Sequence, residues 1–112
     1  MTEDAFRRLV LSLPATEERA HQGHPDFRVG GKIFASLGYP EKGWGMVKLT
    51  PAAQRDHVAA EPEVFVPVRG AWGRQGNTNV QLKKATKAKL LPAVIAAWRN
   101  VAPKKLVAEF DE

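Results

Sequence analysis

The sequence contains no cysteine, and this absence removes several classes of site at once. Disulfide bonds, thiolate catalysis, and zinc or iron–sulfur centres with cysteine ligands are all excluded. Long hydrophobic runs are also missing, because the stretch from Leu9 to Leu13 is too short, and too polar in its flanks, for a signal peptide or a membrane span. We therefore expect a cytoplasmic protein with no membrane partner.

Catalytic and cofactor-binding fingerprints are absent as well. The chain has no P-loop, no dinucleotide-binding glycine pattern and no serine elbow. His21 and His24 form a His-x-x-His spacing, but on a strand or loop this spacing does not place both imidazoles on one face. His24 and Asp26 could form an acid–base pair, yet no nucleophile motif accompanies them. We expect no metal, no cofactor and no enzymatic activity.

Acidic residues are missing from a long part of the C-terminal half. Residues 1–63 carry 8 Lys or Arg against 9 Asp or Glu, whereas residues 64–108 carry 9 Lys or Arg and no acid. Glu109, Asp111 and Glu112 then close the chain, and the formal net charge is +5. Such one-sided charge favours a polyanionic partner, most commonly nucleic acid, although it also serves solubility.

The remaining composition is typical of one globular domain. With 112 residues, of which 44% are hydrophobic, the chain is long enough for one core and too short for two. We place a single domain over residues 1–112, with residues 105–112 as a frayed acidic tail. We expect a monomer.

The stretch from Gly23 to Leu37 predicts a β-hairpin. Gly30 and Gly31 supply the positive φ angles of a two-residue type I′ turn, and β-forming residues flank them. The expected register pairs are Val29 with Lys32, Arg28 with Ile33, and Phe27 with Phe34. Because neither face of the hairpin is cleanly polar, we expect it to be an inner pair of a larger sheet.

Hydrophobic periodicity and capping residues predict the other elements. We expect a helix from Thr2 to Leu13, an edge strand or approach to the hairpin over 16–21, strands over 44–49, 64–68 and 77–82, a helix from Thr50-Pro51 to about Ala60, and a last helix from near Thr86 to Pro103. Pro92 either lies in the first turn of that last helix or kinks it. Clustered strands with helices covering one face indicate an α+β fold.

A series of segments spans nearly the whole chain in a specific order. They are Phe6 and Leu13, Gly23–Arg28, Lys32–Ala35, Gly45–Leu49, Trp72-Gly73 with Thr78 and Val80, and Trp98 followed by Val101–Lys104. In this order they resemble the MmcQ/YjbR family of bacterial proteins. The resemblance implies a CyaY-like, frataxin-related architecture called a double wing, with an antiparallel β-sheet of about five to six strands and helices packed on one face. It also implies DNA binding, which is proposed for the family by analogy of shape.

Cationic, glycine and amide residues make up the candidate binding surface. In the glycine-rich loop expected at Arg69–Gly76 the backbone can approach phosphates, and Trp72 could stack on a base or fill the sheet edge. Asn and Gln amides match the donor and acceptor of adenine, although a solvated strand face has the same composition. The candidate nucleic-acid-binding residues are Arg28, Lys32, Lys48, Arg69, Trp72, Arg74, Asn77, Asn79, Gln81, Lys83 and Lys84.

The leading hypothesis is a DNA-binding protein, of unknown role, that contacts double-stranded DNA mainly through its phosphate backbone. One alternative is a protein-interaction module that uses the hairpin edge or a flat surface at Trp44 and Trp72. Another is a small-molecule-binding protein with a pocket near His24, Asp26 and Arg28.

Overall fold

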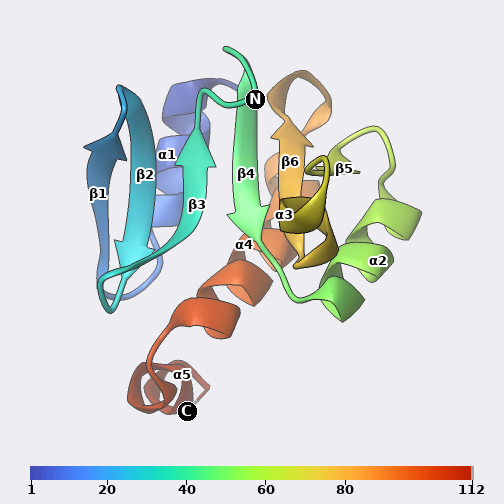
Figure 1. Ribbon diagram of the computed structural model, residues 1–112. Coiled ribbons are helices and arrows are strands. Elements are labelled where there is room, and N and C mark those ends of the chain that lie inside the picture. The colour runs from blue at the N-terminus through green and yellow to red at the C-terminus, as the bar shows by residue number, and fades with distance from the viewer. Residues whose placement is uncertain (112) are drawn as a thin grey trace.

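The computed structural model describes residues 1–111, which form a six-stranded sheet in the order β1-β2-β3-β4-β6-β5 (Figure 1). All neighbouring strands are antiparallel. The strands are β1 (Thr16–His21), β2 (His24–Val29), β3 (Lys32–Leu37), β4 (Trp44–Lys48), β5 (Phe65–Pro67) and β6 (Asn77–Gln81). The helices are α1 (Glu3–Leu11), α2 (Pro51–Ala60), α3 (Ala71–Arg74), the 3₁₀-helix η1 (Leu82–Lys84), α4 (Lys87–Val101) and α5 (Lys104–Phe110). The α+β class is confirmed.

Helices α1 and α4 cover one face of the sheet and leave the other face open (Figure 1). The core lies between the sheet and these helices, where Phe6 and Val10 of α1 and Trp98 of α4 are fully buried. Strand residues such as Phe27 and Val47 complete the core. No helix among residues 1–111 is long and apolar enough to cross a membrane.

Threonine caps fix where the longer helices begin. The Oγ1 atoms of Thr2, Thr50 and Thr86 accept hydrogen bonds from backbone N–H groups three residues later. Helix α4 therefore starts at Lys87, and Pro92 lies inside it rather than in its first turn. The alternative of a later helix start is wrong, because the Thr86 cap defines the first turn.

The central hairpin is an inner pair of the sheet, as expected, and its turn has φ angles of 60° at Gly30 and 79° at Gly31. The register at the turn is confirmed, but Phe27 pairs with Ala35 rather than with Phe34. A β-bulge lies between Phe27 and Arg28, where β3 has one extra residue between Ile33 and Ala35. This extra residue lets Phe34 and Ala35 both reach the core, where each is fully buried.

Two segments expected to be irregular are helical. Residues 71–74 of the predicted glycine-rich loop form the single turn α3. The predicted frayed tail instead forms α5, whose Phe110 ring lies 5.1 Å from the ring of Trp98. Packing on this aromatic neighbour explains why the tail is ordered through Asp111; Glu112, the end of the predicted tail, lies outside the described residues.

Candidate nucleic-acid interface

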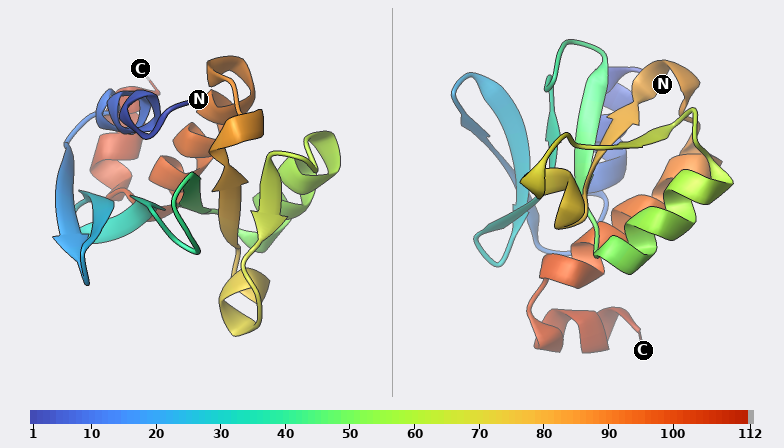
Figure 2. Two further views of the ribbon diagram at one scale, coloured as in Figure 1. Left: turned by 90° about the horizontal axis from the view of Figure 1, so that it is seen from above. Right: turned by 45° about the vertical axis from the view of Figure 1, so that its right-hand side comes forward.

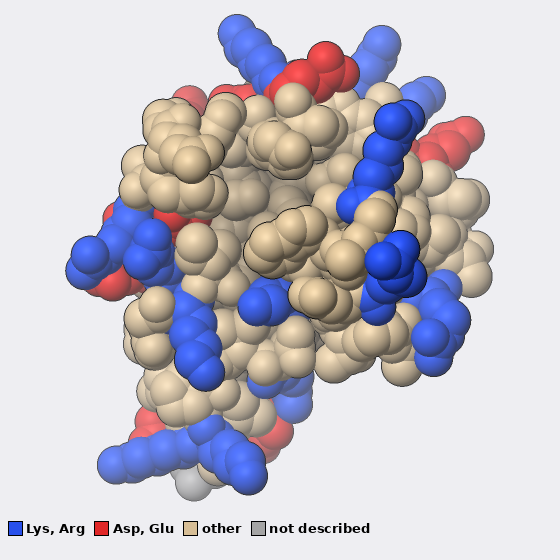
Figure 3. Space-filling view, viewed as in Figure 1, with Lys and Arg blue, Asp and Glu red and all other residues tan. Residues whose placement is uncertain are grey.

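The candidate interface is the open face of the sheet, which consists of the side chains that point away from α1 and α4. Ser36 of β3, Met46 of β4 and Asn79 of β6 are successive cross-strand partners in one row of this face, and Val66 of β5 continues the row. Seen from above, the β1–β2 hairpin and α3 project on either side of the open face (Figure 2, left). The face is hollowed at its centre, and Lys and Arg side chains stand around this hollow (Figure 3).

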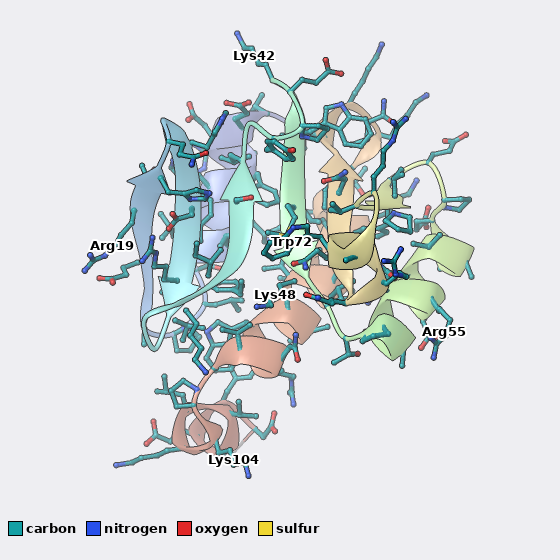
Figure 4. All side chains as sticks on the ribbon, viewed as in Figure 1. Arg19, Lys42, Lys48, Arg55, Trp72 and Lys104 are labelled. Atoms are coloured by element: carbon teal, nitrogen blue, oxygen red, sulfur yellow. The ribbon has the colours of Figure 1, made fainter. Side chains whose placement is uncertain are left out.

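Helix α3 holds Trp72 at the front of the open face, and Lys48 belongs to the same face (Figure 4). Trp72 is 66% exposed, so the possibility that it fills the sheet edge is wrong. Its backbone is fixed from below, because Asn77 Nδ2 donates a hydrogen bond to the Trp72 carbonyl at 3.0 Å. The buried Gln54 of α2 also donates from Nε2 to the Gly73 carbonyl at 2.9 Å.

Two glycines allow this turn to lie directly on neighbouring backbone. A Cβ atom at Gly73 would lie 1.7 Å from the carbonyl oxygen of Val68, and one at Gly76 would lie 2.0 Å from that of Leu49. Gly76 also has a φ of +107°, which disfavours other residues. The glycines therefore serve the packing of α3, rather than the open approach to phosphates that the sequence suggested.

The amide row of β6 is only partly available. Asn77 is 4% exposed and its amide group holds α3, so the side chain is largely covered, and its contact with a base stays a prediction. The Oδ1 atom of Asn79 is buried and has no hydrogen-bond partner among residues 1–111. Gln81 is half-buried and lies opposite Trp44 on the same face. Asn79 and Gln81 thus remain as polar groups of the open face.

Five predicted cations are exposed and have no carboxylate within 4.0 Å among residues 1–111. These free cations are Lys48 on β4, Arg69 and Arg74 beside and within α3, and Lys83 and Lys84 in η1. Lys83 lines a shallow hollow together with Lys42 and the acidic residues Glu3 and Asp4. In the view of the open face, the Lys and Arg side chains stand apart from one another and do not merge into one continuous strip (Figure 3).

Arg28 does not belong to the free cations, because it forms an ion pair with Asp26. Its Nε and Nη2 atoms donate to the two carboxylate oxygens of Asp26 at 2.8 and 3.1 Å. His21 Nδ1 lies 2.8 Å from Asp26 Oδ2, and the Asp26 side chain is completely buried. Arg28 holds the pKa of Asp26 below its usual range against the opposing effect of burial, with His21 assisting. Arg28 is therefore paired within the sheet, and its contact with a phosphate stays a prediction.

Lys32 is exposed at the tip of the central hairpin, but it is the cross-strand partner of Val29, whose side chain is in the core. The same tip packs against the connection between α4 and α5, because a Cβ at Gly30 would lie 2.9 Å from Pro103. The fold therefore places Lys32 on the helix-covered side, away from the open face.

The two nearby histidines are cross-strand partners, since β1 and β2 are joined by a turn at Gln22 and Gly23. The sequence prediction that they would not share a face overlooked this turn. They nevertheless have different neighbours: His21 contacts Asp26, and the ring of His24 lies 6.3 Å from that of Tyr39. Among residues 1–111, no three His, Asp or Glu side chains gather as metal ligands.

Sequence reasoning missed His21 and Gln54. The Gln22-Gly23 pair between two short polar runs is a hairpin signal that would have placed His21 beside Asp26. Gln54 had no comparable signal, because its role depends on the distant backbone of Gly73 and Asn77.

Comparison with known proteins identifies the family of this chain and a solved structure of similar fold. A family model described as YjbR matches residues 11–100. The crystal structure of Deinococcus radiodurans protein DR2400, described as a DUF419 domain, is similar with a TM-score of 0.75 and 17% sequence identity, over 98% of this chain and 88% of that chain. Among curated proteins, none matches the sequence significantly. The family model covers most of the chain and agrees with the resemblance seen in the sequence, so this protein belongs to the YjbR family.

Proposed function

We propose that this protein is a non-enzymatic DNA-binding protein that holds the phosphate backbone with the free cations around its open face. The observation that carries the proposal is the lack of internal partners for these cations. Of the nine Lys and Arg in residues 64–108, Lys89 pairs with Glu61 and Arg99 pairs with Asp111. No ion pair within residues 1–111 neutralises the other seven.

The acidic groups near the open face support the same proposal. Asp26 is buried and neutralised by Arg28, and Glu17 is paired with Arg19 at 3.1 Å. The acids of the strands therefore leave no unpaired negative charge to repel a phosphate backbone on this face. When Lys48, Arg69 and Arg74 neutralise phosphates, the cations condensed on the DNA are released, and this release favours binding.

A salt titration tests this function. If about five cations contact phosphates, the logarithm of the association constant falls with the logarithm of salt concentration with a slope of about −4 to −5. Fluorescence anisotropy with a labelled DNA of mixed sequence measures this slope. Absence of salt-sensitive binding at about 50 mM salt contradicts the proposal.

Charge-matched variants locate the contacts. Arg74→Ala and Lys48→Ala each remove a free cation, and we expect each to lower the slope by about 0.9 for all sequences alike. Arg55→Ala is the matched control, since Arg55 is an exposed cation on α2, at the right-hand edge of the molecule in this view and away from Lys48 (Figure 4). An equal loss with Arg55→Ala would mean that binding is diffuse and does not use the open face.

A further inference from the structure

We propose that the open face binds unpaired bases, with Trp72 as the stacking platform, so that the protein prefers single-stranded to double-stranded nucleic acid. This inference rests on the proposed nucleic-acid function and specifies the form of the ligand. The sequence-based hypothesis was duplex DNA. Phosphate contacts alone, however, do not distinguish a duplex from a single strand.

The first support is the combination of exposure and rigidity at Trp72. Its side chain is 66% exposed, yet its backbone is fixed by Asn77, and Gln54 fixes the next residue. Gly73 lets this turn lie against the Val68 carbonyl with no room for a side chain. A large aromatic ring on a backbone that is already fixed loses less conformational entropy when a ligand covers it than a ring on a loop that orders on binding.

The second support is the chemistry of the surfaces around Trp72. Bases offer flat faces for stacking only when they are unpaired or splayed out, and aromatic side chains on an open sheet are a common platform for them. Met46 and Trp44 are half-buried on the same face, so the neighbouring floor contains apolar side chains beside the amides of Asn79 and Gln81. In a duplex the base faces are already stacked on one another and cannot reach this ring.

The third support is the unpartnered Oδ1 of Asn79, which lies on the open face opposite Met46. Because this oxygen is covered and has no donor, a rotation of the Asn79 side chain toward the open face would let it accept an amino or imino N–H from a base edge. Pairing hides that edge in a duplex, whereas a single strand presents it.

Charge complementarity selects nucleic acid over the other possible occupants of this face. A peptide helix or a second copy of the chain would have to supply many acidic groups to match Lys48, Arg69 and Arg74 around an aromatic centre. A nucleic-acid strand supplies one negative charge and one flat ring system with every nucleotide.

The test compares a thymidine homopolymer of about 16 nucleotides with a mixed-sequence duplex of the same length, at about 50 mM salt, by anisotropy. We expect the single strand to bind more tightly. Trp72→Ala should weaken single-strand binding by about 5- to 100-fold and leave duplex binding nearly unchanged, and Trp72→Phe should restore most of the loss. Leu11→Ala, which alters an exposed apolar residue of α1 on the helix-covered side, is the matched control.

Fluorescence gives an independent measurement, because Trp98 is fully buried and Trp72 is the most exposed of the three tryptophans. The single strand should quench the tryptophan fluorescence of the wild-type protein, and this Trp72-dependent quenching should disappear in Trp72→Ala. Single-strand affinity within about twofold of wild type in that variant, or tighter duplex binding, overturns the inference while the proposed function stands. Failure of both nucleic acids to bind overturns both proposals, and a Trp72-dependent dimer in sedimentation would identify a second copy as the occupant and also overturn the inference.

Discussion

Replacing the buried carboxylate of Asp26 is the most direct test of how the open face is held together. In Asp26→Asn the two hydrogen bonds from Arg28 to a carboxylate are lost or reduced to one bond to an uncharged amide oxygen, and the amide N–H₂ group faces other donors. Hydrogen bonds to a charged group contribute about 1.5–3 kcal/mol each, so we expect the free energy of unfolding to fall by about 3 kcal/mol at neutral pH. For a domain of this length, this corresponds to a fall in melting temperature of about 12 °C.

The pH dependence of this loss identifies its cause. Because folding lowers the pKa of Asp26, its contribution to stability is complete above the unfolded pKa of about 4 and is lost as the pH falls through the lower folded pKa. Urea unfolding of wild type and Asp26→Asn from neutral to acid pH should therefore show a difference that shrinks below about pH 4. A difference that stays constant would refute the ion-pair explanation. Glu17→Gln is the control, since its exposed pair with Arg19 contributes only about 0.5 kcal/mol.

Two further predictions concern packing. Gly73→Ala should lower the free energy of unfolding by about 2–3 kcal/mol and shift Trp72 fluorescence, because its Cβ would collide with the Val68 backbone. Gly31→Ala is the control: it has a φ of +79° with open space around it, and should cost only about 1 kcal/mol in chemical denaturation. Phe110→Ala should lower the free energy of unfolding by about 2 kcal/mol, because its half-buried ring packs on Trp98. Glu109→Ala, on the exposed side of α5, should change this free energy little. An unchanged stability in Phe110→Ala would mean that α5 does not contribute to the core.

Local signals were sufficient to predict most of the fold. Threonine caps, the Gly30-Gly31 turn and strict alternation along β6 are each determined by neighbouring residues, and the structure confirms them. The bulge that turns Ala35 toward the core, beside Phe34, depends instead on how β3 packs against the helices. Helix α5 likewise depends on Trp98, which lies on another element.

The candidate site was less predictable, because the same residue types serve binding and structure. Alternation placed Asn77 and Asn79 on one face correctly, but only the position of α3 shows that Asn77 holds the Trp72 backbone. Arg28 is separated from Asp26 by one residue, which puts both on the same side of a strand, and this spacing alone signals a pair. The fixed and exposed position of Trp72 depends on Gln54, which no sequence pattern connects with it.

The distribution of neutralised and free charge divides the open face into two unequal parts. Along β1 and β2, Arg19 is paired with Glu17 and Arg28 with Asp26, so this projection carries little net charge. The free cations and the exposed tryptophan come from β4, η1 and the segment around α3. A polyanion is drawn to the side with uncompensated positive charge, and stacking acts there as well. The two projections beside the open face are therefore not equivalent, and under the proposed function a bound strand would follow β4 and β6 beside α3 rather than the β1–β2 hairpin.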